Sequence, residues 1–496
     1  MRLHGLLFCL CIHPSYATVT PSVQGAKEIC LQLELMMGNV VFTKDEADYE
    51  SLRTKNWVQT AWGVPACIFH PLGVEELQEV VPMLVGSNAS FAVRSGGHSP
   101  HRGFASIDGG VLIDMSNFNL MDYNPDNNVV VVGAGVTWGD LYTHLQEHQV
   151  IAVGGRIMDV GVGGLTLGGK LTTSVPQQSL TPSTGGLSWL SDLYGLACDN
   201  AVNFRVVLAD GSLVDANSEA NSDLFWALKG GGNNFGILIE VTLMTYPLAQ
   251  VWGGIKTYAI EQVPEVMAAY FEYQSAPIKD PHANLIILIS PTNSTIGVWL
   301  SMVYLKPEEK PAVFAPFYAI NTISDSTAIK SFTDFDWFTT SLAVKQSLYD
   351  KIGEIITTSE SVDVVKSSAA GFMGITLQPI SARVVEIGRL RGGNALGLQA
   401  LDQTWLATAL SWWWPEDDRT IHAAGHDILD ELVTASKAEQ SHLPYLFMND
   451  ASWDQQVIAS YGEDSLLKLR EVQNKYDPDL VFQRLMPGGF KLPARL

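Results

Sequence analysis

Two glycine-rich segments constrain the fold of this chain more than any other feature. The first, Arg94-Ser-Gly-Gly-His98-Ser99, follows the short apolar run 91–93 and combines a glycine turn with hydroxyl groups and an imidazole. The second, residues 154–169, offers many positions without a side chain, where backbone can approach a ligand closely. Loops of this kind can turn their backbone N–H groups toward a phosphate. They therefore predict a bound nucleotide.

The nucleotide is not predicted to be a nicotinamide dinucleotide held by a Rossmann domain. The fingerprint of that domain is G-x-G-x-x-G. After Gly161 and Gly163 the third glycine is replaced by Thr166, and the stretch 133–138 fails in the same way at Trp138.

Composition sets outer limits on structure and partners. With 496 residues, of which 47% are hydrophobic and 17% charged, the chain can bury a large core and is expected to form two lobes. The net charge of −22 argues against a nucleic-acid partner or an anionic membrane surface, because either requires a basic face.

Short strands and helices alternate before residue 250, and the pattern of predicted elements changes after it. Hydrophobic spacing predicts helices at 74–85 and 136–145, the latter capped by Thr137, and strands at 91–93, 111–113 and 128–133. Farther on, strands are expected at 285–290, 296–305 and 383–387 and helices at 263–273, 342–349 and 418–435. For 412–418 we expect the end of a core strand followed by a helix cap, with an aromatic stacking platform as the alternative.

Further motifs accompany the two glycine segments in a fixed order. They are Leu193-Tyr-Gly-Leu-Ala-Cys-Asp-Asn200, Val207-Leu-Ala-Asp-Gly211, Asp223-Leu-Phe-Trp-Ala-Leu-Lys-Gly-Gly-Gly-Asn-Asn-Phe-Gly-Ile237 and Tyr476-Asp-Pro478. Together they closely resemble the berberine-bridge-enzyme-like FAD-linked oxidoreductases, of the vanillyl-alcohol-oxidase type of flavoprotein. The resemblance covers residues 60–247 and 440–490 approximately.

The resemblance implies an α+β fold with a two-subdomain PCMH-type FAD-binding domain and a substrate domain whose antiparallel sheet is flanked by helices. We expect the FAD-binding domain at 18–247, the substrate-binding domain at 248–440, and a C-terminal segment, 441–496, that returns to the FAD domain. The implied cofactor is FAD.

His98 matches the histidine that links the flavin covalently in this family, and a hydrogen-bonding or core histidine is the alternative. Asp199-Asn200 is expected to be a turn bracing the site. His98 and His101 lack further ligands at useful spacing, so no metal site is predicted. The expected cofactor-binding residues are Arg94, Ser95, Gly96, Gly97, His98, Ser99, Val160, Gly161, Gly163, Gly164, Leu165, Gly168, Gly236 and Ile237.

Two substitutions in the second glycine segment refine the expected chemistry. Ile157 stands where many family members carry a second flavin-linking cysteine, and isoleucine cannot form a thioether, so a single link is predicted. Val160 stands where members that react with oxygen tend to have valine, which favours dioxygen as electron acceptor.

The predicted activity is that of an oxidase of a small specialised metabolite, such as an alcohol, amine, phenol or polyketide intermediate, with ring closure as a further outcome. Candidate catalytic residues are Glu386, Tyr445, Asn449 and Asp450. A carbohydrate oxidase is the alternative, and a non-redox cyclase or binding protein that retains its flavin is another. We expect a monomer that binds a small-molecule substrate and dioxygen.

The N-terminus predicts export. Residues 1–17 combine a positive start, a short apolar core and a small residue at a cleavage point, which is typical of a secretory signal, and an ordinary apolar N-terminus is the alternative. No later run is long enough to span a bilayer. Cys30 and Cys67 match a disulfide pair of the family, while Cys198 is expected to be buried and inert. Asn88 and Asn293 begin glycosylation sequons.

One segment, 170–185, breaks the family pattern. Gly169-Lys170 can be encoded with a splice donor and Thr184-Gly185 with an acceptor, and removal of what lies between restores Leu167-Gly-Gly-Gly-Leu-Ser-Trp in frame. A retained intron is one interpretation, and a genuine polar surface loop is the other. Deletion of this segment is expected to leave flavin incorporation undiminished.

Overall fold

The protein is described by a computed structural model covering residues 23–168, 187–293, 295–330, 341–369, 371–412 and 414–493. The predicted signal segment, 1–17, and the anomalous segment, 170–185, lie outside the described residues.

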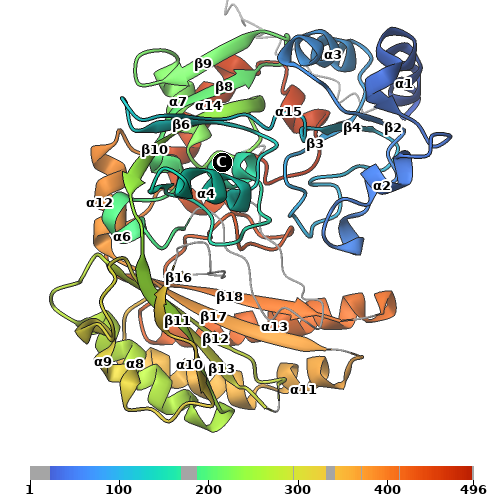
Figure 1. Ribbon diagram of the computed structural model, residues 1–496. Helices are drawn as coiled ribbons and strands as arrows, with labels where there is room; N and C mark the ends of the chain where they lie inside the picture. The colour runs from blue at the N-terminus through green and yellow to red at the C-terminus, as the bar shows by residue number, and fades with distance from the viewer. Residues whose placement is uncertain are drawn as a thin grey trace, which may run out of the picture.

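Three sheets form the framework, and they lie in two halves (Figure 1). The upper half holds a four-stranded sheet in the order β1-β2-β4-β3 and a six-stranded sheet in the order β5-β6-β10-β8-β9, with β7 beside β10. Their bounds are β1 Val41–Phe42, β2 Cys67–Phe69, β3 Phe91–Arg94, β4 Val111–Asp114, β5 Met121–Asn124, β6 Val129–Gly133, β7 Val150–Ala152, β8 Ala201–Val207, β9 Leu213–Asn217 and β10 Ile237–Pro247.

The lower half holds an eight-stranded antiparallel sheet in the order β14-β11-β13-β12-β17-β18-β16, with β15 beside β11. The bounds are β11 Val251–Tyr258, β12 Ala283–Ile289, β13 Val298–Tyr304, β14 Ser324–Asp325, β15 Ala328–Lys330, β16 Ser341–Ala343, β17 Phe372–Ile380 and β18 Gln403–Ser411. The predicted α+β class is confirmed.

Helices complete both halves. Those of the upper half are α1 Val23–Met37, α2 Tyr49–Arg53, α3 Val74–Gly86, α4 Trp138–Gln146, α5 Val162–Thr166, α6 Ser191–Tyr194, α7 Ser222–Leu228, α14 Glu463–Tyr476 and α15 Val481–Arg484. Those of the lower half are α8 Val263–Ser275, α9 Ala315–Tyr318, α10 Gln346–Thr358, α11 Glu360–Ser367 and α13 Asp418–Ala438, while α12 Ala382–Leu390 lies against α6 where the halves meet.

The large lower sheet is buried on both faces. Every residue of β12 and β13 is buried, and alternate residues point to opposite sides of a strand. Leu285 and Ile287 join the core beneath the sheet with residues of α8, α10 and α13, whereas Ile286 joins the core of the upper half. This explains why β12 is apolar throughout and does not alternate.

The C-terminal segment packs back onto the upper half. The backbone N–H of Phe91 in β3 donates to the carbonyl of Leu485 at 2.8 Å, and Lys475 on α14 pairs with Asp223 on α7 at 2.6 Å. Strands from early in the sequence therefore lie beside the last helices (Figure 1).

Most predicted elements are confirmed. Helices 74–85, 136–145, 263–273 and 418–435 correspond to α3, α4, α8 and α13, and Thr137 caps α4 by accepting a bond from the Asp140 backbone N–H. The strands expected at 91–93, 111–113, 128–133, 285–290 and 296–305 are β3, β4, β6, β12 and β13.

Three predictions were wrong. The strand expected at 383–387 is the helix α12, because Val384, Val385 and Gly388 are buried at helical spacing. The helix expected at 342–349 begins only at Gln346. The core strand expected at 412–414 has already ended, since β18 stops at Ser411, and Trp412 instead donates to Asp418 at the start of α13.

The predicted disulfide is present: Cys30 on α1 is bonded to Cys67 at the start of β2. Cys198 is buried and free, and burial raises the pKa of its thiol, as expected for an inert cysteine.

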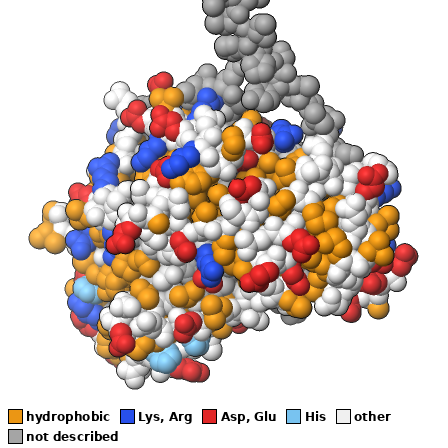
Figure 2. All heavy atoms as spheres, turned by 90° about the horizontal axis from the view of Figure 1, so that it is seen from above, with side chains coloured by type: hydrophobic (Ala, Val, Ile, Leu, Met, Phe, Trp, Pro, Cys, Tyr) orange, Lys and Arg blue, Asp and Glu red, His pale blue; other side chains and the backbone are white. Residues whose placement is uncertain are grey.

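None of the described helices combines the length and the apolar character needed to cross a bilayer. On the face seen in Figure 2, acidic and basic side chains are interspersed among apolar ones.

Candidate active site

The upper half holds a partly open cavity with a volume of about 110 Å³. Its walls come from both glycine segments, from the Gly-Gly-Asn-Asn turn before β10, and from the C-terminal segment. Of the fourteen predicted cofactor-binding residues, those on its wall are Ser95, Gly96, Gly97, His98, Ser99, Val160, Gly161, Gly163, Gly164, Leu165, Gly236 and Ile237.

The two glycine segments meet backbone to backbone. A Cβ added to Gly96 would lie 2.5 Å from the Gly161 nitrogen, and one added to Gly161 would lie 2.4 Å from the Gly96 nitrogen. Ser95 fixes the first loop by donating to the carbonyl of Ala134 at 2.5 Å, and Gly97 adopts φ +69°. Only residues without a side chain fit at this crossing.

Arg94 does not line the cavity, although it was expected to bind the cofactor. Its guanidinium is buried beneath the loop, where it donates to Asp114 and to the carbonyl of Leu52, both at 2.6 Å, and to Asn56 at 3.0 Å. Hydrogen bonds and the charge of Arg94 outweigh burial and lower the pKa of Asp114 to about 2. Arg94 therefore supports the loop from below.

His98 lies on the cavity wall with its ring held by Trp57. The two rings stack at 5.2 Å with an interplanar angle of 13°, and the Trp57 indole N–H donates to the His98 carbonyl at 3.0 Å. The imidazole is half-buried because one side faces the cavity, and burial lowers its pKa to about 4. At neutral pH the ring is therefore uncharged, and a neutral imidazole can act as a nucleophile.

Two other positions of the second segment lie off the wall. Ile157 is buried in the core of the upper half. Gly168 packs instead against the C-terminal segment, since a Cβ there would lie 2.7 Å from the Met448 sulfur.

Several wall residues were not predicted. The turn before β10 contributes Gly232 and Asn233, and the C-terminal segment contributes Met448, Met486, Gly489 and Phe490. The segments are joined because Asn233 donates to the Gly488 carbonyl and Asn234 to that of Phe490, each at 2.9 Å. The motif 230–237 was the available signal for Gly232 and Asn233, whereas no local pattern marks Met448.

Three of the four catalytic candidates lie together beside Met448. Tyr445 packs between Trp405 and Tyr461, with ring centroids 5.4 and 5.8 Å away, and burial raises the pKa of its phenol well above the usual range. The charge of Asp450 raises the same pKa, which places that carboxyl nearby. Glu386 does not join them, because it is exposed on α12.

Asn449 has a buried side-chain amide without hydrogen-bonding partners in the described part of the chain. Its side chain is 1% exposed, yet neither its amide nitrogen nor its oxygen has a hydrogen-bonding partner within the described part of the chain. A buried amide left without partners costs stability, so both amide atoms of Asn449 are open to a hydrogen bond with a further group.

A further polar group joins the two halves. Arg156 donates to Gln378 on β17 and lies 5.2 Å from the ring of Trp189. Asn200, by contrast, is buried and donates to the carbonyls of Tyr194 and Leu196, which gives Asp199-Asn200 the bracing role expected of it.

The residues present fit FAD. The closely crossed glycines leave backbone exposed to the cavity, and a Cβ on Gly164 would meet no described protein atom within 4 Å although this residue lines the wall. The cavity is thus shaped for a ligand that approaches backbone directly, as a pyrophosphate does. This fold and this site define a flavin-dependent oxidoreductase.

Comparisons with known proteins agree. The FAD binding domain family matches residues 65–181. The chain is 35% identical to a bifunctional solanapyrone synthase from Alternaria solani, over 91% of this chain and 86% of the relative. It is 33% identical to an FAD-dependent monooxygenase from Arthrobotrys oligospora, over 93% of this chain and 89% of the relative.

Solved structures share the fold at low sequence identity. One is 6-hydroxy-D-nicotine oxidase from Arthrobacter nicotinovorans, with TM-score 0.74, 20% identity and coverage of 92% of this chain and 98% of the other. Another is the glucooligosaccharide oxidase from Acremonium strictum, which carries a 6-S-cysteinyl, 8α-N1-histidyl FAD, with TM-score 0.72, 17% identity and coverage of 95% of this chain and 100% of the other.

The chain belongs to the berberine-bridge-enzyme-like family of FAD-linked oxidoreductases. It is an FAD-dependent enzyme of the type found in fungal secondary metabolism.

Proposed function

We propose that this enzyme is an oxidase of a small specialised metabolite and that it passes the electrons to dioxygen. The cavity carries the proposal, because it brings His98, the crossed glycines and the C-terminal segment onto one wall. FAD bound there would accept a hydride at its N5 atom and deliver two electrons to dioxygen, giving hydrogen peroxide.

We propose one covalent flavin link, through His98. The bond would replace the imidazole proton and one hydrogen of the 8α-methyl group, and the two electrons released would pass to dioxygen. The neutral ring and its stack against Trp57 support this role, because they supply a nucleophile in a fixed orientation. Ile157 supplies no thiol for a second link.

Among the catalytic candidates, the proposal assigns proton acceptance to Asp450. Tyr445 stays protonated at neutral pH because burial raises its pKa, so the phenol can donate a hydrogen bond to the substrate but cannot serve as the resting base. Asn449 would orient the substrate or the flavin ring through its two unpartnered amide atoms.

The proposed substrate is a flat or partly aromatic molecule. Trp405, Tyr445 and Phe447 form a buried aromatic cluster, with the ring centroids of Trp405 and Phe447 4.4 Å apart. Tyr445 and Phe447 shortly precede Asn449 and Asp450 in the chain, and the proposal is that movement of this segment brings the substrate against the cluster. An alcohol, amine, phenol or polyketide intermediate fits such surroundings, and its oxidised form can close a ring. The naming of the Alternaria solani relative as a synthase is consistent with this class.

Oxidation of a carbohydrate is the second candidate, since the fold is shared with the glucooligosaccharide oxidase. Replacement of the second flavin-linking cysteine by Ile157 argues against it. A flavin-retaining cyclase or binding protein without redox turnover is the candidate from another class.

An anaerobic substrate panel, read by flavin absorbance, distinguishes these functions. The proposal expects bleaching by specialised metabolites and stoichiometric peroxide when air is admitted. Bleaching by oligosaccharides alone would establish the second candidate, and a flavin that no substrate bleaches would support the third. Acid precipitation tests the link: flavin should remain on the peptide that contains His98, and complete release would refute covalency.

We also infer that the enzyme is exported or enters the secretory pathway as a monomer. The disulfide between Cys30 and Cys67 supports this inference, because such bonds persist in oxidising compartments. Finding the chain in culture medium or vesicles, cleaved near residue 17 and glycosylated at Asn88 or Asn293, would test it. Residence in the cytosol would contradict it.

A further inference from the structure

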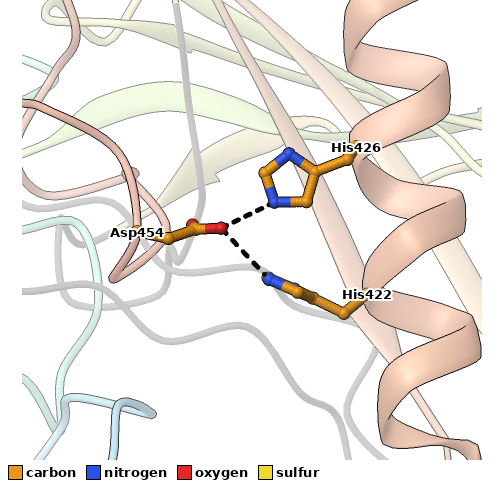
Figure 3. Close-up of side chains that lie close together, drawn as sticks. All are labelled: His422, His426 and Asp454. Atoms are coloured by element: carbon orange, nitrogen blue, oxygen red, sulfur yellow. Dashed lines mark hydrogen bonds and ion pairs between the residues drawn. The ribbon is translucent and has the colours of Figure 1, made fainter.

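Two histidines and an aspartate converge on the side of α13 (Figure 3). The Nε2 atom of His422 lies 3.3 Å from Oδ2 of Asp454, and that of His426 lies 2.8 Å from the same oxygen. One potential ligand atom from each residue lies within 4.8 Å of the others. None of these side chains belongs to the flavin cavity.

Helix spacing places the two histidines, and a separate segment of the chain places Asp454. His422 and His426 are four residues apart on α13, so they project from the same face one turn apart. Asp454 comes from the segment after Asp450, and the neighbouring Trp453 stacks on His422 with ring centroids 5.9 Å apart at 13°. The stack holds the His422 ring in place beside the carboxylate.

We propose that His422, His426 and Asp454 bind one divalent transition-metal ion, with zinc as the best fit. Two atoms bound at 2.0–2.1 Å in tetrahedral geometry lie about 3.3 Å apart. Each histidine nitrogen lies 3.3 or 2.8 Å from Asp454 Oδ2, and all three ligand atoms lie within 4.8 Å of one another, so small side-chain shifts would form the site. Two imidazoles and one carboxylate suit zinc, whereas calcium and magnesium prefer oxygen ligands alone. Water would complete the coordination.

The geometry around Asp454 is open to an ion. The Nε2 atoms of both imidazoles face the same carboxylate oxygen, Oδ2, at 3.3 and 2.8 Å. An ion between the three groups would share the carboxylate charge. The histidine side chains are 39% and 41% exposed, so an ion could enter from solvent.

Such an ion would connect α13 of the lower half to the segment that carries Met448, Asn449 and Asp450. This segment forms part of the proposed substrate side, so occupancy of the metal site should reduce its motion. The proposal does not depend on the proposed oxidase activity, because zinc affinity can be measured without any substrate.

The test uses the full-length, flavin-loaded protein without a histidine tag, treated with a chelator and dialysed. Zinc titration by competition with a chromogenic chelator should show one ion per chain at micromolar concentration or below. The variants His422→Asn, His426→Asn and Asp454→Asn should each weaken zinc binding at least about tenfold. Cobalt should give the absorption bands of a low-coordinate site in the wild type but not in these three variants.

His148→Asn is the matched control. His144 and His148 also stand four residues apart, with ring centroids at 5.8 Å, but no carboxylate joins them among the clusters found in the described residues. This variant should bind zinc as the wild type does. Flavin content should be the same in all four variants, which shows that they fold. The proposal is overturned if the wild type takes up no stoichiometric zinc, or if the three ligand variants bind it as tightly as the wild type.

Discussion

The flavin side and the substrate side of the active site are built in different ways. The flavin side consists of two glycine loops whose function depends on backbone geometry, and each loop is contiguous in the sequence. The proposed substrate side would be assembled from Arg156, Gln378, Trp405 and the segment around Asn449, which are far apart along the chain. Sequence motifs therefore identify the cofactor much more readily than the substrate.

Loss of the proposed base, Asp450, should have the largest effect on the rate of flavin reduction. This variant tests whether the substrate side acts separately from the flavin side. Asp450→Asn is expected to slow flavin reduction by about 10²–10⁴-fold without reducing flavin content, because only proton acceptance is removed. Stopped-flow reduction under anaerobic conditions measures it. Asp122→Asn, on exposed β5, is the control and should reduce its flavin normally. A wild-type reduction rate in Asp450→Asn would reject the assignment.

On the flavin side, breaking the buried ion pair between Arg94 and Asp114 beneath the first loop should have the largest effect on stability. Asp114→Asn leaves Arg94 buried without a counter-charge and is expected to cost about 3–5 kcal/mol of unfolding free energy. Urea unfolding measures it. Glu354→Gln, which breaks the exposed pair with Lys351, should change little.

The ion pair between Arg94 and Asp114 also predicts how the stability of the protein depends on pH. The folded-state pKa of Asp114, about 2, lies below its usual value of 3.8, so its contribution is present above pH 4 and is lost as the pH falls toward 2. Asp114→Asn should therefore destabilise the protein much less at pH 2.5 than at pH 7. An equal loss at both values would contradict this account.

Adding a side chain where the two glycine loops cross should have a smaller effect on stability but should clearly lower the amount of bound flavin. Gly161→Ala places a Cβ 2.4 Å from the Gly96 nitrogen, and the shift needed to relieve it is expected to cost about 1–3 kcal/mol. Flavin content of the purified protein should fall. Gly86→Ala, where a Cβ meets nothing within 4 Å, is the control. Full flavin loading in Gly161→Ala would show that the loops need not cross so closely.

The smallest effect is expected where the two halves meet. Asp192 on α6 is buried and accepts hydrogen bonds from Ser381 and Asn284 of the lower half, yet burial raises its pKa to about 6. A folded-state pKa above the usual 3.8 means that stability falls as the pH rises from 4 through 6. Asp192→Asn should remove this loss, so its stability relative to the wild type should rise by about 2 kcal/mol between pH 4 and pH 7.5. A difference that does not change with pH would contradict the shifted pKa.

Sequence patterns predicted the elements whose own residues decide their structure. Thr137 before α4 and the apolar run of β12 led to correct predictions, because a cap and a buried strand are visible locally. Residues 383–387 led to a wrong one, because Val384-Val385 fits a strand as well as the buried face of α12. Packing against α6 decided between the two.

The sequence by itself identified the two glycine-rich segments and, through its resemblance to a known family, the FAD cofactor and the disulfide, whereas the crossing at Gly96 and Gly161 appeared only in the tertiary structure. The features identified from the sequence rest on residue types that few other structures require, such as closely spaced glycines. Tertiary structure alone decided that Arg94 supports the loop from below, that Glu386 is exposed, and that Met448 reaches the cavity. It also brought Asp454 to His422 and His426. The physical reason is that contacts between distant segments depend on how elements pack, and no local pattern records that packing.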